Sequence, residues 1–377
     1  MSTASLHRML VPPAVLAATT LLVFGACGGG GGGAGVVAPP VTPPAPPPPT
    51  ATCTFTNPIM RGADPSVVRQ GNVYYSVQSR DGGIVVFRSD ALTQLDRNGV
   101  RVWTRPDTGW NSRNVWAPEL EAIDGKWYIY YAAGRSGPPF TTQRTGVLES
   151  ATSDPQGAWI DRGQLWTGDG PAGDPPDNVW AIDMTVGRIG GVLYAVWSGW
   201  ERNAFTDRTP QNLYIARMAS PTRIAGPRVR LSAPTAPWEQ RTVPDGLELQ
   251  EGPELVERGG RTYVFYSTRE SWLPGYQLGL LTLNAGADPL VAASWVKTGP
   301  VFSGSGNVFG VGHASFTTSP DGTEDWIVYH AKTTASPGWD DRVIRTQRFT
   351  WNADGTPSFG TPVQTGVPTA RPSGECR

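Results

Sequence analysis

Short apolar runs bounded by glycine-containing turns recur along the chain. The clearest example is Glu251–Thr268, in which an acidic residue is followed by Gly252-Pro253, a Gly259-Gly260 turn and the aromatic and β-branched run Thr262–Ser267. Paired glycines supply the positive φ angles that a tight hairpin requires. The pattern therefore predicts a β-hairpin whose first strand begins at an acid.

The same order of features occurs five times. Each unit opens on an ionisable side chain, the five being Asp64, Glu119, Asp183, Glu251 and His313. The turn glycines that follow are Gly71, Gly125, Gly191, Gly260 and Gly322, which are 54, 66, 69 and 62 residues apart. Repeats of this length with no long amphipathic helix predict an all-β fold, a five-bladed β-propeller. Radial blades would bring the five polar groups together around one axis.

The N-terminal segment has the features of an export signal. In residues 1–26 a short basic segment precedes the apolar run Met9–Phe24, which contains Pro12-Pro13 and ends in small residues. This pattern is typical of a signal peptide rather than a spanning helix. Phe24–Cys27 also resembles the lipobox of bacterial lipoproteins, which predicts lipidation of Cys27; cleavage and release is the alternative.

Residues 27–51 are rich in glycine and proline and predict an extended tether, so the propeller domain is expected at 52–377. Cys53 and Cys376 stand at the two ends of that domain. In an oxidising compartment they predict a disulfide that links the first blade to the last, the alternative being two free thiols.

Composition narrows the class of ligand. The net charge is −1 and no Lys/Arg run occurs, which argues against nucleic acid as a partner. The 15 Trp and 11 Tyr residues fall mostly on the expected strands and so predict core packing, although any that line a cleft would suit stacking on sugar rings.

Three of the five opening residues are suited to breaking a glycosidic bond. That reaction needs one protonated carboxyl group to assist the leaving oxygen and one ionised carboxylate to activate water or attack the sugar. The candidates are Asp64, Asp183 and Glu251. Structural alternatives are a turn role for Asp64, a buried hydrogen-bonded role for Asp183, and Glu254 as the functional acid in place of Glu251.

At these positions the chain resembles glycoside hydrolase family 43, the five-bladed propellers that act on arabinose- and xylose-containing polysaccharides. The resemblance extends from about Asn57 to Pro362 and depends on five short motifs in order. They are Gly62-Ala63-Asp64-Pro65-Ser66, Trp116-Ala117-Pro118-Glu119-Leu120, Trp180-Ala181-Ile182-Asp183, Glu251-Gly252-Pro253 and Gly312-His313.

The resemblance implies an inverting hydrolysis that needs no cofactor. Asp64 corresponds to the general base, Glu251 to the general acid, and Asp183 to the acid that orients Glu251 and tunes its pKa. A neighbouring carboxylate disfavours ionisation of Glu251, which is consistent with these roles. Glu119 is interpreted as structural or as a hydrogen-bonding group of the pocket.

Three further residues receive roles from the resemblance. Trp116 corresponds to an aromatic wall beside the sugar, with core packing as the alternative. His313 corresponds to a histidine that faces the central channel and, in arabinan-cleaving relatives, holds a hydrated cation such as calcium; a hydrogen-bonded role is the alternative. Arg342 is similar to an arginine that contacts the terminal sugar in exo-acting relatives, the alternative being a surface arginine.

Stretches such as Val196–Trp200 are most similar to the exo-α-1,5-L-arabinofuranosidase branch of the family. The expected substrate is an arabinose-containing plant cell-wall polysaccharide or oligosaccharide, and the expected location is exported, as a surface or periplasmic lipoprotein or as a secreted enzyme. The alternatives are a β-xylosidase, a galactan hydrolase or an endo-arabinanase on the same scaffold, and a sugar-binding propeller without catalysis.

Overall fold

The computed structural model describes residues 53–168 and 178–376, which lie in one compact unit. The predicted signal peptide (1–26), the lipidation site Cys27 and the tether (27–51) lie outside the described residues. Regular structure in the described part is β-strand apart from three short 3₁₀ turns, Leu92–Gln94, Pro237–Glu239 and Ala292–Ser294. No helix in this part is long and apolar enough to cross a membrane.

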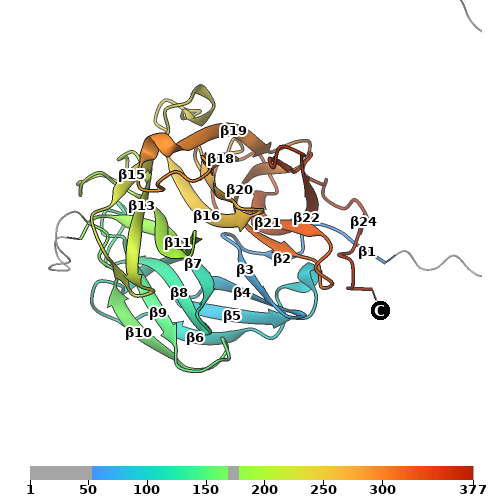
Figure 1. The fold of residues 1–377 in the computed structure, drawn as a ribbon, viewed down its shortest axis with the longest axis horizontal. Coiled ribbons are helices and arrows are strands. Elements are labelled where there is room, and N and C mark those ends of the chain that lie inside the picture. Colours follow the sequence, from blue (N-terminus) through green and yellow to red (C-terminus); the bar gives the residue numbers. More distant parts are fainter. Residues whose placement is uncertain (1–52, 169–177, 377) are drawn as a thin grey trace, which may run out of the picture. The chain divides into compact units, whose positions relative to one another are not determined.

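Five antiparallel sheets follow one another around a common centre, which confirms the predicted five-bladed β-propeller (Figure 1). Blade 1 contains β3 (Ser66–Gln70), β4 (Val73–Arg80), β5 (Gly83–Ser89) and β6 (Val100–Thr104). Blade 2 contains β7 (Arg113–Ile123), β8 (Lys126–Gly134), β9 (Arg144–Ser150) and β10 (Trp159–Gln164). Blade 3 contains β11 (Ala181–Ile189), β12 (Val192–Gly199) and β13 (Asn212–Ser220), to which β14 (Arg223–Ile224) and β15 (Val229–Ser232) pair.

Blade 4 contains β16 (Gln250–Arg258), β17 (Arg261–Thr268), β18 (Gln277–Leu283) and β19 (Trp295–Ser303). Blade 5 contains β20 (Phe309–Thr318), β21 (Asp325–Lys332) and β22 (Arg342–Trp351), with β23 (Pro357–Ser358) beside β22. The first strands β3, β7, β11, β16 and β20 are innermost, and each contacts the next around the ring (Figure 1).

The ring closes between the two ends of the domain. β2 (Met60–Arg61) pairs with β22 and so becomes the fourth main strand of blade 5. β1 (Thr54–Phe55) pairs with β24 (Thr369–Ala370), and Cys53 and Cys376 form a disulfide beside this pair. Closure therefore combines main-chain hydrogen bonds with one covalent link.

The five largest hydrophobic clusters of the described residues each lie between two neighbouring blades. Tyr130 of blade 2, for example, packs in one cluster with Trp197 of blade 3. Both faces of each blade are thus buried, which explains why β8 and β12 are apolar at nearly every position. Full burial of one large apolar side chain contributes about 1.5–3 kcal/mol, so packing between blades accounts for most of the aromatic residues.

Candidate active site

An irregular backbone position marks the inner strand of every blade. A left-handed residue with φ between 36° and 53° lies in or just before each of these strands, the five being Asp64, Ala117, Asp183, Gly252 and His313. In β7, β11, β16 and β20 the pairing register shifts around this residue. Such bulges interrupt the hydrogen-bond ladder and redirect side chains. The five inner strands therefore share one device for presenting polar groups.

The left-handed residues show that two of the five opening residues, Glu119 and Glu251, do not occupy the position that Asp64 occupies. The residue of blade 2 that is equivalent to Asp64 is Ala117, whereas Glu119 lies two positions further along β7. Treating Glu119 as the equivalent of Asp64 was therefore wrong, because the sequence does not show where a bulge adds a residue. Glu251 also differs, since it stands one position before the left-handed Gly252.

The structure brings the three predicted acids together. Asp64, Asp183 and Glu251 line one cavity of about 490 Å³. Side chains of Asp183 and Glu251 are buried, and that of Asp64 is 22% exposed. Aromatic side chains form much of the wall, namely Trp116, Phe140, Trp180, Trp272 and Trp339.

His313 is the cation at the centre of this group. Its Nε2 lies 2.7 Å from Oε1 of Glu119, and its Nδ1 lies 3.4 Å from Oδ1 of Asp64 and 3.9 Å from Oδ2 of Asp183. Burial alone would lower the pKa of His313, but Asp64, Glu119 and Asp183 outweigh it and raise that pKa to about 10. The imidazole is therefore protonated at neutral pH.

Asp64 is held in its ionised form. Nη1 of Arg342 donates to Oδ1 of Asp64 at 3.2 Å, and Nδ1 of His330 lies 3.1 Å from the same oxygen. Burial alone would raise the pKa of Asp64, but Arg342, His313 and His330 together hold it well below its usual range. Asp64 is thus a carboxylate at every pH at which the protein would work.

Asp183 and Glu251 have the opposite tendency. Burial first, and then the neighbouring carboxylates, raise the pKa of both groups. Oδ2 of Asp183 accepts the backbone N–H of Gly252 at 3.0 Å, while the hydroxyl of Tyr276 donates to Oε1 of Glu251 at 2.9 Å. The cavity therefore contains one ionised carboxylate and two carboxyl groups that tend to hold a proton.

Two glycines make this packing sterically feasible. Gly252 has φ +53°, and a Cβ there would lie 3.0 Å from the ring of His313. A Cβ on Gly312 would lie 2.2 Å from the ring of Tyr276. Substitution at either position would displace a residue that contacts the acids.

The residues predicted to contact the sugar also lie at this cavity. Trp116 lines it and packs edge to face on Phe140, with ring centroids 4.9 Å apart. Arg342 lines it and contacts Asp64. Glu119 and Glu254 do not line it, and Glu119 contacts His313 instead.

The cation predicted from His313 stays a prediction. Within residues 53–168 and 178–376 there is no group of three or more His, Cys, Asp or Glu side chains that could hold a metal ion. Both ring nitrogens of His313 face carboxylates, and a protonated imidazole has no lone pair for direct ligation. The side chains on this wall therefore fit a proton better than a directly bound metal.

Sequence reasoning missed several residues of the site. Tyr276 and His330 contact Glu251 and Asp64, and their rings stack with centroids 5.5 Å apart. His330 had one visible signal, because it is an ionisable residue directly after the apolar run Trp326–Tyr329. Tyr276 had none, since it precedes the third strand of its blade and the repeat was read from the first two strands.

Five blades around one cavity with paired carboxyl groups define a β-propeller of the glycoside hydrolase class. Comparison with models of protein families identifies the family within this class. The chain belongs to glycosyl hydrolases family 43, whose model matches residues 55–357.

Relatives of this chain include enzymes named for arabinofuranose. The chain is 38% identical over 333 residues to an extracellular exo-α-(1→5)-L-arabinofuranosidase of Streptomyces avermitilis, covering 84% of this chain and 66% of that protein. It is 33% identical to the Streptomyces chartreusis enzyme of the same name, covering 74% and 82%. The chain thus spans slightly less than two thirds of the Streptomyces avermitilis relative.

Similar solved structures include another enzyme named as an arabinofuranosidase. The crystal structure of an α-L-arabinofuranosidase from Lactobacillus brevis superposes with a TM-score of 0.74 at 32% identity, covering 83% of this chain and 98% of that one. A thermostable family-43 glycoside hydrolase, at 23% identity and a TM-score of 0.67, shows the fold alone.

The charge on His313 predicts a pH dependence of stability. Because the folded-state pKa is about 10 against an ordinary value of 6.5, the protonated imidazole stabilises the fold fully below pH 6.5 and loses that contribution as the pH rises toward 10. We expect the free energy of unfolding of the unmodified protein to fall over this range more steeply than that of His313→Gln, as measured by urea titration.

His330→Gln is the matched control. Burial holds the pKa of His330 at about 4, so this residue is neutral throughout pH 6.5–10 and its variant should keep the slope of the unmodified protein. Equal slopes for His313→Gln and His330→Gln would contradict the charged state of His313.

Proposed function

We propose that this chain is an exported, inverting glycoside hydrolase that releases L-arabinofuranose from α-1,5-linked arabinan or arabino-oligosaccharides. The observation that supports the reaction type best is the split in protonation tendency between Asp64 and Glu251 within one cavity. The names of the Streptomyces relatives support the sugar and the linkage.

In the proposed mechanism Glu251 is the general acid. Its raised pKa keeps a proton on the carboxyl group, and this proton passes to the glycosidic oxygen as the bond to the sugar breaks. Asp64 is the general base, which removes a proton from the attacking water on the opposite face of the ring. Transfers of this kind contribute typically 10²–10⁴-fold each to the rate.

Asp183 is proposed as a positioning residue. Its carboxylate oxygen accepts the N–H of Gly252, the residue directly after Glu251, and thereby fixes the backbone that carries the general acid. Burial and the neighbouring Glu251 raise the pKa of Asp183 itself. The chemistry assigned to these three side chains needs no cofactor.

Substrate contacts are proposed for Trp116, His313 and Arg342, together with the rim pair Trp272 and Trp339. The last two rings lie edge to face with centroids 5.3 Å apart, and Trp339 is 47% exposed. Exposed aromatic rings beside a carboxylate pocket suit stacking on sugars.

The proposal extends to the parts of the chain outside the described residues. Residues 1–26 act as the export signal, Cys27 carries a lipid anchor after processing, and residues 27–51 tether the catalytic domain at 52–377. Support comes from the sequence pattern and from the Streptomyces relatives, which are named extracellular.

Product analysis tests the proposed function. Incubation with debranched arabinan should release monomeric L-arabinose from the start, and xylan and galactan should release no monosaccharide. Proton NMR of the first-formed sugar should show the β-anomer, because inversion reverses the configuration of the α-linked substrate. Larger first products would indicate an endo-arabinanase, and an α-anomer would exclude inversion.

Glu251→Gln tests the general acid. We expect kcat on α-1,5-arabinobiose to fall about 10²–10⁴-fold. The loss on 4-nitrophenyl α-L-arabinofuranoside should be much smaller, because nitrophenolate leaves without a proton. Glu257→Gln on the exposed end of β16 is the control and should retain activity. Equal losses on both substrates would assign Glu251 another role.

Tyr276→Phe tests the tuning of that acid. The tyrosine hydroxyl donates to Glu251 and favours its ionised form, so its removal should raise the pKa of Glu251 further. The alkaline limb of the kcat profile should then move to higher pH. An unchanged limb or a move to lower pH would contradict the assignment of that limb to Glu251.

A further inference from the structure

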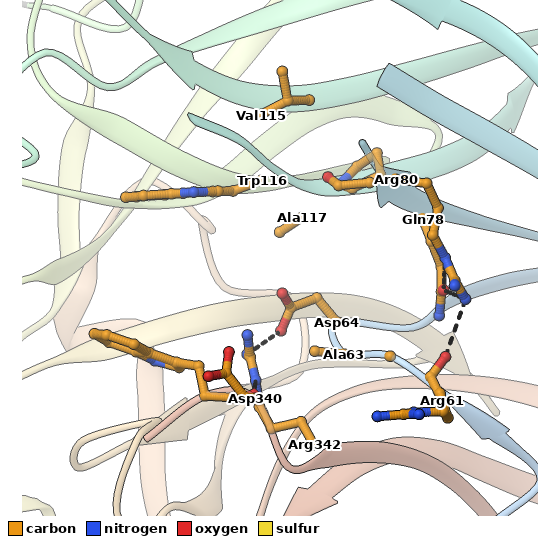
Figure 2. Close-up of a pocket in the computed structure, with 14 residues that line it drawn as sticks. Arg61, Ala63, Asp64, Gln78, Arg80, Val115, Trp116, Ala117, Asp340 and Arg342 are labelled. Atoms are coloured by element: carbon orange, nitrogen blue, oxygen red, sulfur yellow. Dashed lines mark hydrogen bonds and ion pairs between the residues drawn. The ribbon is translucent and has the colours of Figure 1, made fainter. Parts of the chain in front are cut away.

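A second cavity of about 310 Å³ shares lining residues with the one that holds the three acids. Figure 2 shows the residues of this second cavity. The two cavities share one wall, formed by Asp64, Trp116, Ala117, Trp339 and Arg342. Asp183 and Glu251 line only the first cavity. We call the second cavity the side lobe; it lies beyond Asp64 and away from the proposed general acid.

Guanidinium groups dominate the side lobe. Arg61, Arg80 and Arg342 line it, against the carboxylates of Asp64 and Asp340. Arg342 and Asp64 pair with each other at 3.2 Å, which leaves two guanidinium groups and the exposed Asp340. The side lobe therefore carries a net positive charge, because the Arg342–Asp64 pair is neutral and two arginines remain against Asp340.

The partners of Arg80 are neutral. Its Nη2 donates to the backbone oxygen of Arg61 at 3.0 Å and to Oε1 of Gln78 at 2.6 Å, and its Nε donates to Oε1 of Gln78 at 3.1 Å. Arg61 is exposed, on the short strand β2. Within the described part of the chain, neither arginine has a carboxylate partner within 4.0 Å.

Gln78 adds an unused donor to the same wall. The two bonds from Arg80 fix Oε1 as the acceptor, so Nε2 is the free end of the amide. Nε2 has no hydrogen-bond partner, although Gln78 is only 3% exposed. A buried donor without a partner is costly unless a ligand or water satisfies it. Gly62, which lacks a Cβ, leaves room for this amide.

We infer that the side lobe binds a carboxylate-bearing sugar, a uronic acid residue of the plant cell-wall polysaccharide to which the arabinan is attached. The occupant must be a sugar because the lobe shares the Trp116 wall with the reaction cavity, and this step rests on the proposed function. The occupant is anionic because Arg61 and Arg80 lack a counter-ion. Guanidinium groups bind carboxylates through charge-assisted hydrogen bonds.

Calorimetric titration with D-galacturonate and D-galactose tests the proposal on the full chain. These two sugars differ in one carboxylate, so galacturonate should bind at least about tenfold more tightly. The difference should shrink as the salt concentration rises, because exposed charges are screened. Equal binding of the two sugars would make the side lobe a neutral sugar site, and no binding of galacturonate would overturn the proposal.

Arg61→Glu localises the interaction. This variant should weaken galacturonate binding about tenfold or more, while hydrolysis of 4-nitrophenyl α-L-arabinofuranoside stays unchanged. The control is Arg88→Glu, an exposed arginine on β5 of blade 1 that does not line the side lobe. Binding that is unaffected by Arg61→Glu, or weakened equally by Arg88→Glu, would place the carboxylate elsewhere and overturn the assignment.

The galacturonate-binding experiments and the hydrolysis experiments can fail independently of each other. Galacturonate binding by a protein that hydrolyses no arabinofuranoside would leave the side lobe in place and remove the enzyme assignment. Hydrolysis of arabinofuranosides without galacturonate binding would support the enzyme assignment and overturn the proposal for the side lobe.

Discussion

The protonated imidazole of His313 offsets the repulsion between the carboxyl groups at the centre of this propeller. Five inner strands converge, and Glu119, Asp64 and Asp183 lie around His313. Several unpaired carboxylates in a partly buried space would repel one another and resist desolvation. These carboxyl groups raise the pKa of His313 to about 10, so a positively charged ring faces carboxyl groups from three blades.

This shared charge has a chemical consequence. A single imidazolium and one guanidinium, that of Arg342, do not neutralise four carboxyl groups. Asp64 receives both cations and stays ionised, whereas Asp183 and Glu251 tend to retain a proton. Asymmetric distribution of positive charge thus gives similar side chains opposite protonation tendencies, and the base and acid proposed for glycosidic hydrolysis need such a difference.

The sequence predicted much of this arrangement because the repeat is local. Glycine turns and apolar strands recur in every unit, so five blades and the gathering of Asp64, Asp183 and Glu251 followed from the pattern. What it could not reveal was the position of each bulge, and Glu119 was therefore aligned two residues out of register. Tyr276 and His330 were missed for another reason. Tyr276 precedes the third strand of blade 4, outside the part of the repeat that the pattern defines, and the contact of His330 in blade 5 is with Asp64 before the first strand of blade 1.

The two cavities share Arg342, and its contact with Asp64 decides which of them its charge serves. Arg342 is held against Asp64, so its charge already serves the reaction cavity. An anion in the side lobe that depended on Arg342 would weaken this pair and raise the pKa of Asp64. Arg61 and Arg80 supply positive charge on the far wall instead (Figure 2). A uronate bound there would leave the Asp64–Arg342 pair intact, so recognition of an acidic sugar is compatible with the ionised state that the proposed base needs.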